Sequence, residues 1–258
     1  MPQRSNDFIQ SLERGLAVMN SFSRERTNQT LSEVAQMTGL TRATARRVLL
    51  TLAELGYVHQ SSRSFSLTPK MLDLGYSYLS SLEVVEVAQR PMERLVEEVR
   101  ESSSMSVLDG SEIVYVARVP TQRIMTIALA LGSRLPAYPT SMGRVLLSGL
   151  PDSQIDNYIE QTKLERLTPH TVTDPDEFRA AIDEVRATGF ALVDQELEVG
   201  VRSIAAPIVN GRREVIAAMN ISCHASRVTL GQIRGEFRPK LIATAHEISR
   251  LARALPGN

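Results

Sequence analysis

The stretch TLSEVAQMTGLTRATARRVLLTLAELGYVHQSSRSFSL, residues 30–67, predicts two short helices followed by a β-hairpin. Thr30 and Glu33 have the Thr-x-x-Glu spacing of a capping box, in which each side chain satisfies a free backbone donor at a helix start. Gly39 permits the left-handed turn that ends this first helix, and Thr41 can cap the next one. The two helices are therefore joined by a tight, glycine-bearing turn.

The second helix has one apolar and one basic face. Its apolar residues recur at intervals of three and four, which buries one stripe of the helix: Ala45, Val48, Leu49 and Leu52. The opposite face carries Arg42, Thr44, Arg46 and Arg47. This pattern is typical of a helix-turn-helix, whose second helix enters the DNA major groove.

Arginines on a helix are also common as solvated side chains, and the periodicity alone does not decide between the two interpretations. The following residues favour DNA binding. Residues 57–60 and 64–67 alternate like short strands around a polar tip, which predicts a wing directly after the second helix. Arg63 at the tip could reach backbone phosphate or the minor groove. The residues expected to form the DNA-binding surface are Thr41, Arg42, Ala43, Thr44, Arg46, Arg47 and Arg63.

Composition places the 258-residue chain among globular proteins, with 43% hydrophobic and 22% charged residues. No apolar run approaches the ~20 residues of a membrane span, and the N-terminus lacks a signal peptide's apolar core. We therefore expect a cytoplasmic protein without a membrane partner. The single cysteine, Cys223, excludes an intrachain disulfide and a Cys-rich zinc site, and no metal site is expected.

The net charge is zero, but it is unevenly distributed. Residues 1–80 contain nine Lys and Arg residues against six Asp and Glu residues, an excess of three positive charges. The remainder contains 20 against 23, an excess of three negative charges. The sign fits a basic module on a neutral-to-acidic body. Because affinity rises with the number of phosphates neutralised, so small an excess suggests that DNA binding needs more than one copy.

The segments that flank the helix-turn-helix are also predicted to be helical. Residues 10–22 form a first helix with Leu12, Leu16 and Met19 on the face that joins the small core, and residues 23–29 form a loop. Residues 70–82 form a linker helix that is apolar on more than one face, so it should pack against the DNA-binding module or a second subunit.

The remaining chain alternates between strands and helices. Pro91 should break or kink a helix over residues 83–101. Asp109-Gly110 predicts a hairpin turn, because it supplies the positive φ that the turn needs. The expected strands are residues 105–108, 113–119, 123–131, 190–194, 203–209 and 214–222, with a loop at 132–138; the expected helices are residues 140–148, 152–161, 175–188 and 229–255. Hairpins without regular crossovers indicate an α+β fold with an antiparallel sheet and flanking helices.

A search for catalytic motifs finds no nucleophile elbow, phosphate-binding glycine loop, dinucleotide fingerprint or zinc-protease motif. Cys223 and His224 are adjacent, so on a strand they point to opposite faces and make a poor nucleophile–base pair. Asp194, Glu196 and Glu198 alternate along an extended segment, and we interpret the last two as a solvated loop edge. Neither an enzyme activity nor a cofactor is expected.

Small polar residues set among apolar ones predict a ligand cavity. Ser141 and the free amides after it lie at a helix start, which is a ready anion site. Ser203, Asn220 and Ser222 can point to one face of the sheet. A mostly apolar cavity with a few convergent polar groups is typical of a small-molecule site. The alternative is that these are ordinary, satisfied polar residues.

Several segments together resemble the IclR family of bacterial transcriptional regulators over nearly the whole chain. The resemblance rests on SLERGL (11–16), TRATARR (41–47) with the following L-x-x-LGY (52–57), LPA (135–137) leading into S-x-GRVLLS (141–148), and GVRSIAAP (200–207). The TARR form of the second helix, with RLTP (166–169) and TVTD (171–174), is most similar to the branch that regulates protocatechuate and β-ketoadipate pathway genes.

The resemblance implies three parts: a winged helix-turn-helix at residues 1–68, a linker helix at 69–82 and a GAF-like effector-binding domain at 83–258. It also implies a homodimer or homotetramer. The implied effector-binding residues are Ile127, Leu135, Ser141, Met142, Asp194, Val201, Ser203, Asn220 and Ser222. Ser203 is often cysteine in the family and Asn220 often serine, so these departures bear on the identity of the ligand.

The leading hypothesis is a regulator that binds a double-stranded DNA operator and responds to a small organic acid, with aromatic-acid catabolic genes as targets. For an activator, RNA polymerase would be a further partner. The rival is a cytosolic small-molecule-binding or enzymatic domain whose helical N-terminus serves only for dimerisation. A structural adaptor, the third alternative, would bind neither DNA nor ligand.

Overall fold

The computed structural model describes residues 7–121 and 129–254. The chain divides into two compact units, Met1–Ser81 and Leu82–Asn258, and each is described by itself. Within the described part of the chain no helix is long and apolar enough to cross a membrane.

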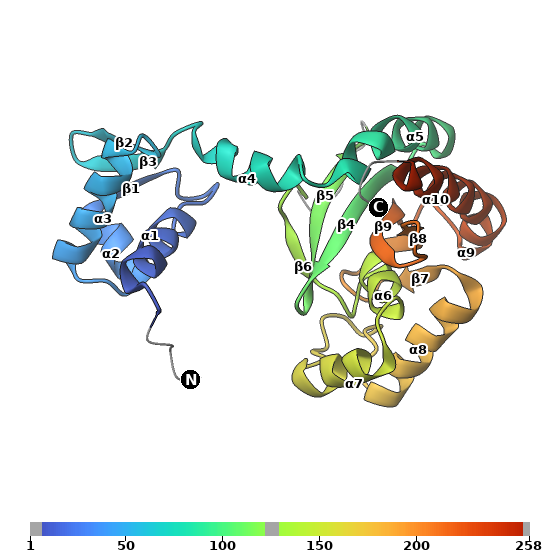
Figure 1. Cartoon of the computed structure of the whole chain (residues 1–258). Helices are drawn as coiled ribbons and strands as arrows, with labels where there is room; N and C mark the ends of the chain where they lie inside the picture. The colour runs from blue at the N-terminus through green and yellow to red at the C-terminus, as the bar shows by residue number, and fades with distance from the viewer. Residues whose placement is uncertain (1–6, 122–128, 255–258) are drawn as a thin grey trace. The chain divides into compact units, whose positions relative to one another are not determined.

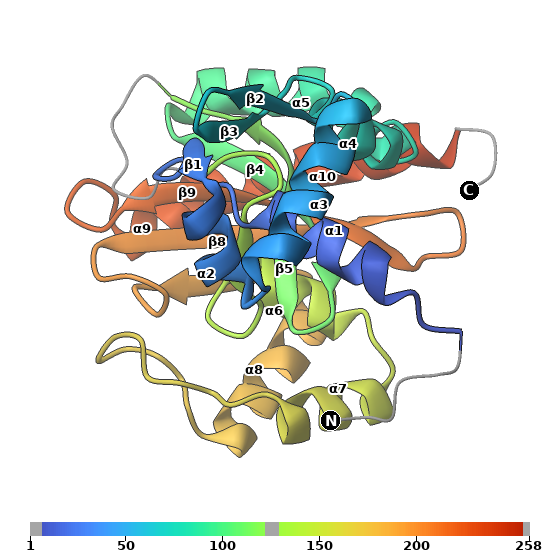
Figure 2. The ribbon, with the colours of Figure 1, turned by 90° about the vertical axis from the view of Figure 1, so that its left-hand side faces the viewer.

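The N-terminal unit is a winged helix-turn-helix (Figures 1 and 2). Its elements in order are α1 (Gln10–Asn20), β1 (Asn28–Thr30), α2 (Leu31–Thr38), α3 (Arg42–Glu54), β2 (Val58–Ser61), β3 (Ser64–Leu67) and α4 (Met71–Leu79). The hairpin β2–β3 was predicted from the sequence. Strand β1 was not, because residues 23–29 were expected to be loop; it pairs with β3 and gives a sheet of order β1-β3-β2.

The turn chemistry that the sequence indicates is present at both helix starts. The Thr30 backbone donates to Glu33 Oε2 at 2.6 Å, and the Glu33 backbone donates to Thr30 Oγ1 at 3.3 Å, which completes the capping box. Gly39 ends α2 at φ 66°, and Thr41 Oγ1 accepts the Thr44 amide at 3.2 Å. These contacts fix where α2 begins and ends and where α3 begins.

The core of this unit differs from the expectation at α1. Ala45 and Leu49 are fully buried as predicted, and Val34 of α2 is fully buried with them, but Leu12 and Leu16 are 60% and 47% exposed. Val18 takes their place in the core, because α1 reaches the other helices through its C-terminal half, where Met19 also packs. The prediction that Leu12 and Leu16 join the core was therefore wrong.

The C-terminal unit is built on one six-stranded antiparallel sheet of order β6-β5-β4-β9-β8-β7 (Figure 1). Its elements in order are α5 (Glu83–Val99), β4 (Ser102–Asp109), β5 (Glu112–Val119), β6 (Arg134–Pro136), α6 (Ser141–Ser148), α7 (Asp152–Gln161), α8 (Pro175–Thr188), β7 (Ala191–Asp194), β8 (Val201–Val209), β9 (Val215–His224), α9 (Leu230–Gln232), a π-helical turn (Ile233–Phe237) and α10 (Arg238–Arg253). Residues 123–128 of the expected strand 123–131 lie outside the described residues, and its last three residues, 129–131, are not in a strand. Strand β6 lies in the expected loop 132–138.

Helices cover both faces of the sheet. Helices α5 and α10 pack together on one face, and α6 packs on the other with α8 behind it (Figure 1). Helix α5 runs through Pro91 without ending, so the expected break is absent; Pro91 is buried and packing holds the helix there. Gly143 sets how closely α6 approaches the preceding loop, because a Cβ there would lie 2.0 Å from the Ala137 carbonyl oxygen.

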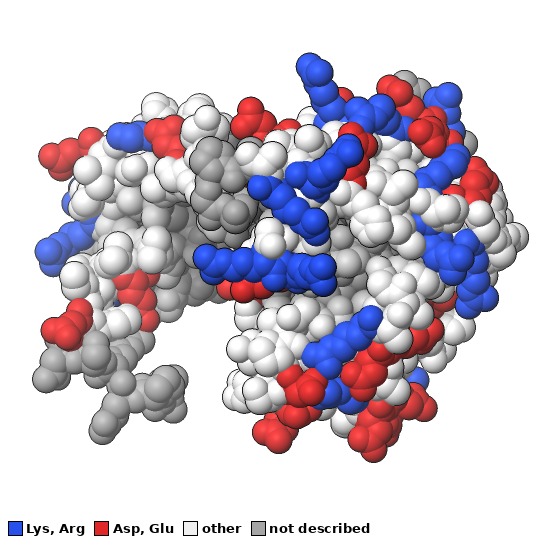
Figure 3. Space-filling model, turned by 45° about the vertical axis from the view of Figure 1, so that its right-hand side comes forward, with Lys and Arg blue, Asp and Glu red and all other residues white. Residues whose placement is uncertain are grey.

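The surface helices α7 and α8 are joined by ion pairs. Arg179 and Arg186 of α8 both pair with Asp152 of α7, and Arg179 also pairs with Asp156. Figure 3 shows acidic and basic side chains intermixed over the lower part of this unit, where the two helices lie. Exposed pairs of this kind contribute little to stability individually and mainly hold these helices in register.

Candidate DNA-binding surface and effector cavity

The basic residues predicted to contact DNA lie on the exposed side of α3 and on the wing. Arg42 and Arg46 are one turn apart and share a face, and Arg47 is also exposed. Arg63 is exposed between β2 and β3. Among the described residues, none of these four guanidinium groups forms a salt bridge. Their positive charge is therefore available to phosphate or to base edges.

The C-terminal end of α3 is held in place by the residues that follow the wing. Thr68 Oγ1 donates to the Gly56 carbonyl at 2.6 Å, and Lys70 Nζ donates to the Leu55 carbonyl at 2.9 Å. The Lys70 ammonium also lies 5.0 Å from the centre of the Tyr57 ring. Because Lys70 is the residue before α4, these bonds tie the start of α4 to the end of α3.

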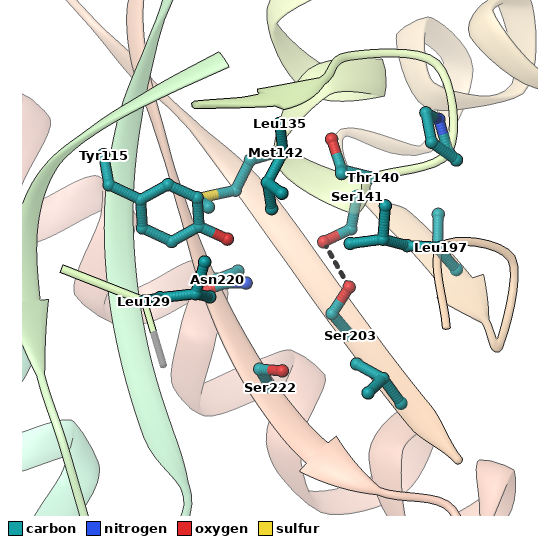
Figure 4. A pocket seen from close by; sticks show the side chains of 13 residues that line it. Tyr115, Leu129, Leu135, Thr140, Ser141, Met142, Leu197, Ser203, Asn220 and Ser222 are labelled. Carbon is teal, nitrogen blue, oxygen red and sulfur yellow. Dashed lines mark hydrogen bonds between the residues drawn. The ribbon is translucent and has the colours of Figure 1, made fainter. Parts of the chain in front are cut away.

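A small cavity lies between α6 and the sheet (Figure 4). The space within it is about 30 Å³, which holds a water molecule or two but no aromatic ring. Apolar side chains form most of its wall. It is lined by Tyr115, Leu129, Leu135, Pro139, Thr140, Ser141, Met142, Val193, Leu197, Val201, Ser203, Asn220 and Ser222. A ligand larger than water must displace side chains to enter.

The N-terminus of α6 supplies polar groups to one side of the cavity. Thr140, and not Ser141, caps the helix, because its Oγ1 accepts the Gly143 amide at 3.0 Å. The Ser141 hydroxyl is thereby free to bond with the Ser203 hydroxyl at 2.8 Å (Figure 4). The amides of Ser141 and Met142 belong to the first turn, which has no intrahelical acceptor for them. This end of the cavity suits an oxygen atom with negative charge.

The sheet supplies a second set of polar groups. Asn220 Oδ1 accepts the Ser104 amide at 3.0 Å, so its side-chain NH₂ is the group left to face a ligand. The Ser106 hydroxyl bonds Met142 sulfur at 3.3 Å, which ties α6 to β4 beneath the cavity. Burial raises the pKa of Tyr115 to about 12, so its phenol stays protonated and can donate or accept a hydrogen bond.

Behind the cavity, a buried ion pair joins α6 to the loop after β7. Arg144 Nη2 and Glu196 Oε2 are 2.6 Å apart, and the two side chains are 7% and 8% exposed. Glu196 also accepts the Val172 amide at 3.0 Å, and Arg144 Nε donates to the Tyr138 carbonyl. The interpretation of Glu196 as a solvated loop residue was wrong, because Gln195 at φ 61° turns the chain and directs the carboxylate inward.

Seven of the nine residues expected to bind effector line the cavity: Leu135, Ser141, Met142, Val201, Ser203, Asn220 and Ser222. Ile127 lies outside the described residues. The structure differs from the expectation at Asp194, which pairs with Arg202 at 2.6 Å and does not line the cavity. Its neighbour Val193 is opposite Ser203 in the β7–β8 register and takes the cavity position instead.

Sequence reasoning missed Tyr115, Leu129, Pro139, Thr140, Val193 and Leu197. The period of two could have identified Val193 only together with the β7–β8 register, which pairs Val193 with Ser203 and which the sequence does not contain. It could not have placed Tyr115, because the β4–β5 register shifts between Met105 and Ser106 and changes which side chains share a face.

The fold and the two sites define a class of protein: a DNA-binding regulator with a winged helix-turn-helix and a separate ligand-sensing domain. Comparison with known families agrees with this class. The profile of the bacterial transcriptional regulator IclR C-terminal domain matches residues 76–250, and the IclR helix-turn-helix domain profile matches residues 11–62. The chain belongs to the IclR family of bacterial transcriptional regulators, and it is not an enzyme.

Curated relatives match nearly the whole chain. The Pca regulon regulatory protein of Pseudomonas putida is 41% identical over 243 residues, 94% of this chain and 84% of that protein. The p-hydroxybenzoate hydroxylase transcriptional activator of Acinetobacter baylyi is 38% identical over 253 residues, 96% of this chain and 93% of that protein.

Solved structures share the fold. A proposed transcriptional regulator from Rhodococcus sp. RHA1 is 54% identical with a TM-score of 0.87, covering 95% of this chain and 98% of that one. An IclR homologue from Microbacterium hydrocarbonoxydans complexed with 4-hydroxybenzoate is 25% identical with a TM-score of 0.84, covering 95% and 100%. The inducer-binding domain of a double mutant of Acinetobacter PobR, in complex with 3-hydroxybenzoic acid, is 37% identical with a TM-score of 0.62, covering 65% and 98%.

Proposed function

We propose that this protein regulates genes for the breakdown of aromatic acids, and that a small aromatic carboxylate or its ring-opened product is the effector. The polar cluster at the α6 end of the cavity is the observation that carries this proposal. Ser141 and Ser203 bond to each other at 2.8 Å beside a helix N-terminus, inside a mostly apolar wall. The relatives named for Pca and p-hydroxybenzoate regulation, and the two structures with hydroxybenzoates, support this ligand class.

The effector acts by opening the cavity. A volume of about 30 Å³ excludes an aromatic acid, so binding must separate groups that are in contact in this structure, the Ser141–Ser203 pair among them. A ligand can shift an equilibrium only by the difference between its affinities for the two states. The closed arrangement of the cavity supplies that difference, because the acid fits only an open one.

DNA is bound by Arg42, Arg46 and Arg47 of α3 and by Arg63 of the wing, with Thr41, Ala43 and Thr44 completing the surface at the start of the helix. The four arginines are exposed and have no carboxylate partner among the described residues, which supports this role. An arginine that reads guanine contributes about 1–3 kcal/mol of discrimination, whereas loss of a phosphate contact weakens binding to all sequences alike.

The protein binds DNA as a homodimer or a dimer of dimers. Apolar residues of the N-terminal unit are exposed on α1 and α4, with Leu12 at 60%, Leu72 at 74% and Tyr76 at 71%. A groove of about 520 Å³ beside α1 includes Leu12, Leu16 and Leu55 in its lining. Large exposed apolar surface of this kind is typical of protein–protein interfaces. A second copy would cover it and double the phosphate contacts.

An electrophoretic shift assay tests the DNA-binding role of α3. The probe is the DNA upstream of this gene, at 50 and 200 mM salt. The variants are Arg46→Ala and the matched control Arg250→Ala, which removes another exposed arginine, from α10. We expect Arg46→Ala to weaken the specific complex about 5-fold to 150-fold, from the ~1–3 kcal/mol above. Equal binding by both variants would refute the role assigned to α3.

Isothermal titration calorimetry tests the effector. Protocatechuate, 4-hydroxybenzoate and β-ketoadipate are titrated into the full chain, and Ser141→Trp serves as a variant whose cavity is filled. We expect at least one acid to bind wild type and none to bind the variant. If no acid binds, or if Ser141→Trp binds as well as wild type, the cavity is not the effector site.

A further inference from the structure

A positively charged side chain lies on the cavity face of the sheet, beside the residues already described. In the β4–β5 pairing Arg118 is opposite Ser104, and in the β4–β9 pairing Ser104 is opposite Asn220. Residues directly opposite each other in antiparallel strands project to the same face. Asn220 lines the cavity, so Arg118 projects from that face of the sheet as well.

A bulge brings Arg118 and Tyr115 to the same face although they are three residues apart. The register shifts between Met105 and Ser106, so that Ala117 pairs with Met105 while Tyr115 pairs with Ser106. Three residues along a regular strand would reverse the direction of the side chain, and the extra residue restores it. Tyr115 lines the cavity, and the Arg118 charge is close enough to act on the pKa of its phenol.

No carboxylate among the described residues pairs with the positive charge of Arg118. It is half-buried, and among the described residues it forms no salt bridge and no side-chain hydrogen bond. Arg134 and Arg144, the neighbouring arginines on β6 and α6, each pair with a carboxylate. Of the described residues that line the cavity, none is charged. A carboxylate entering this site would otherwise be buried without a counter-ion, which is costly.

We propose that Arg118 binds a carboxylate of the effector, while Ser141 and Ser203 bind a second polar group at the other end of the molecule. This inference rests on the proposed function. Figure 4 shows Tyr115 and the Ser141–Ser203 pair on opposite sides of the cavity, with Asn220 between them. Arg118 shares strand β5 and its cavity face with Tyr115. An acid with one polar group has nothing to replace the hydrogen bond that it breaks between the two serines.

The effector is therefore a bifunctional acid, and two kinds fit this chemistry. A para-hydroxybenzoate places its carboxylate on Arg118 and its phenol on the serines. A six-carbon dicarboxylate places a carboxylate at each end, with the second one at the α6 N-terminus. Benzoate, which lacks the second group, should bind at least 10-fold more weakly than 4-hydroxybenzoate, because it breaks the hydrogen bond between buried Ser141 and half-buried Ser203 without replacing it.

Calorimetry with acid and amide ligands tests the contact directly. The ligands are 4-hydroxybenzoate, 4-hydroxybenzamide, benzoate and β-ketoadipate, and the proteins are full-length wild type, Arg118→Gln, Arg118→Met and the control Arg250→Gln. We expect wild type and the control to bind 4-hydroxybenzoate about 10-fold to 100-fold more tightly than 4-hydroxybenzamide, which is the range of a charge-assisted, bidentate hydrogen bond. In both Arg118 variants that ratio should fall to about one.

The outcomes separate this inference from the function on which it rests. If no acid binds wild type, the proposed function fails. If an acid binds wild type and both Arg118 variants with the same acid-to-amide ratio, the carboxylate does not contact Arg118 and this inference is overturned, while the effector remains. Circular dichroism and ligand-free DNA binding confirm that each variant is folded. The wild-type preference between 4-hydroxybenzoate and β-ketoadipate identifies which bifunctional acid is the effector.

Discussion

Replacing Glu196 by leucine should lower the free energy of unfolding of the C-terminal unit more than substitution of an exposed residue would. The Arg144 side chain is only 7% exposed, and the change removes the carboxylate that pairs with it. The Tyr138 carbonyl and the Phe178 ring remain next to the guanidinium. The change also removes the acceptor of the Val172 amide. Breaking a buried ion pair by removing one partner costs about 3–5 kcal/mol, most of it from the charge left unpaired.

The double variant Arg144→Met/Glu196→Leu separates charge from packing. It removes both charges and keeps similar volumes, and replacement of a whole buried pair by apolar residues is often neutral or stabilising. We therefore expect the double variant to lie within about 1 kcal/mol of wild type, apart from the Val172 amide that it also leaves without an acceptor. The coupling between the two positions should be about 2 kcal/mol or more.

Urea unfolding followed by circular dichroism and tyrosine fluorescence measures these differences; the chain contains no tryptophan. The data require two transitions, since the chain has two compact units. With a slope of about 2 kcal/mol per molar urea, a loss of 3 kcal/mol lowers the midpoint of one transition by about 1.5 M. A single variant that loses less than about 1 kcal/mol, or a double variant as unstable as the single, would refute the account of the buried pair.

Three further changes have clear expected outcomes. Gly143→Ala should cost about 1–3 kcal/mol or more and abolish effector binding in calorimetry, because the new Cβ would meet the Ala137 carbonyl at 2.0 Å and push α6 away; unchanged stability would contradict this packing. Burial raises the pKa of Cys223 from 9.0 to about 12, so the folded chain keeps a proton that the unfolded chain loses. The contribution of Cys223 to the free energy of unfolding is complete below pH 9 and is lost towards pH 12 by at most about 1.4 kcal/mol per pH unit. In Cys223→Ala, the free energy of unfolding, measured from unfolding curves at a series of pH values, should therefore fall less steeply between pH 9 and pH 12. Leu16→Glu, at a position 47% exposed in the α1 groove, should shift the mass in analytical ultracentrifugation towards monomer and weaken DNA binding, while leaving the fold intact; an unchanged mass would place the interface elsewhere.

The N-terminal unit could be predicted almost completely because its signals are local. Capping residues, the glycine turn and the hairpin each specify the conformation of a few neighbouring residues, and the structure contains all three. The exceptions depend on distant contacts. Strand β1 exists because β3 lies beside it, and Leu12 is exposed because only the C-terminal half of α1 reaches the core.

The cavity was predictable only where strand alternation is regular. The period of two places Asn220 and Ser222 on one face, and they line the cavity together with Ser203, which is opposite Ser222 in the β8–β9 register. The same rule excludes Asp194 once the β7–β8 register is known, but the sequence does not contain that register. Tyr115 depends on a bulge, and the inward turn of Glu196 depends on the positive φ of Gln195, so neither is visible in a pattern of residue types.

The central claim is that occupation of the cavity controls DNA binding. Fluorescence anisotropy with DNA from upstream of this gene tests it most directly, in the presence and absence of the acid that calorimetry identifies. We predict that saturating acid changes the Kd of wild type about 5-fold or more, the usual size of allosteric coupling, and leaves the Kd of Ser141→Trp unchanged. An acid that binds the cavity and leaves the Kd of wild type unaltered would contradict the claim.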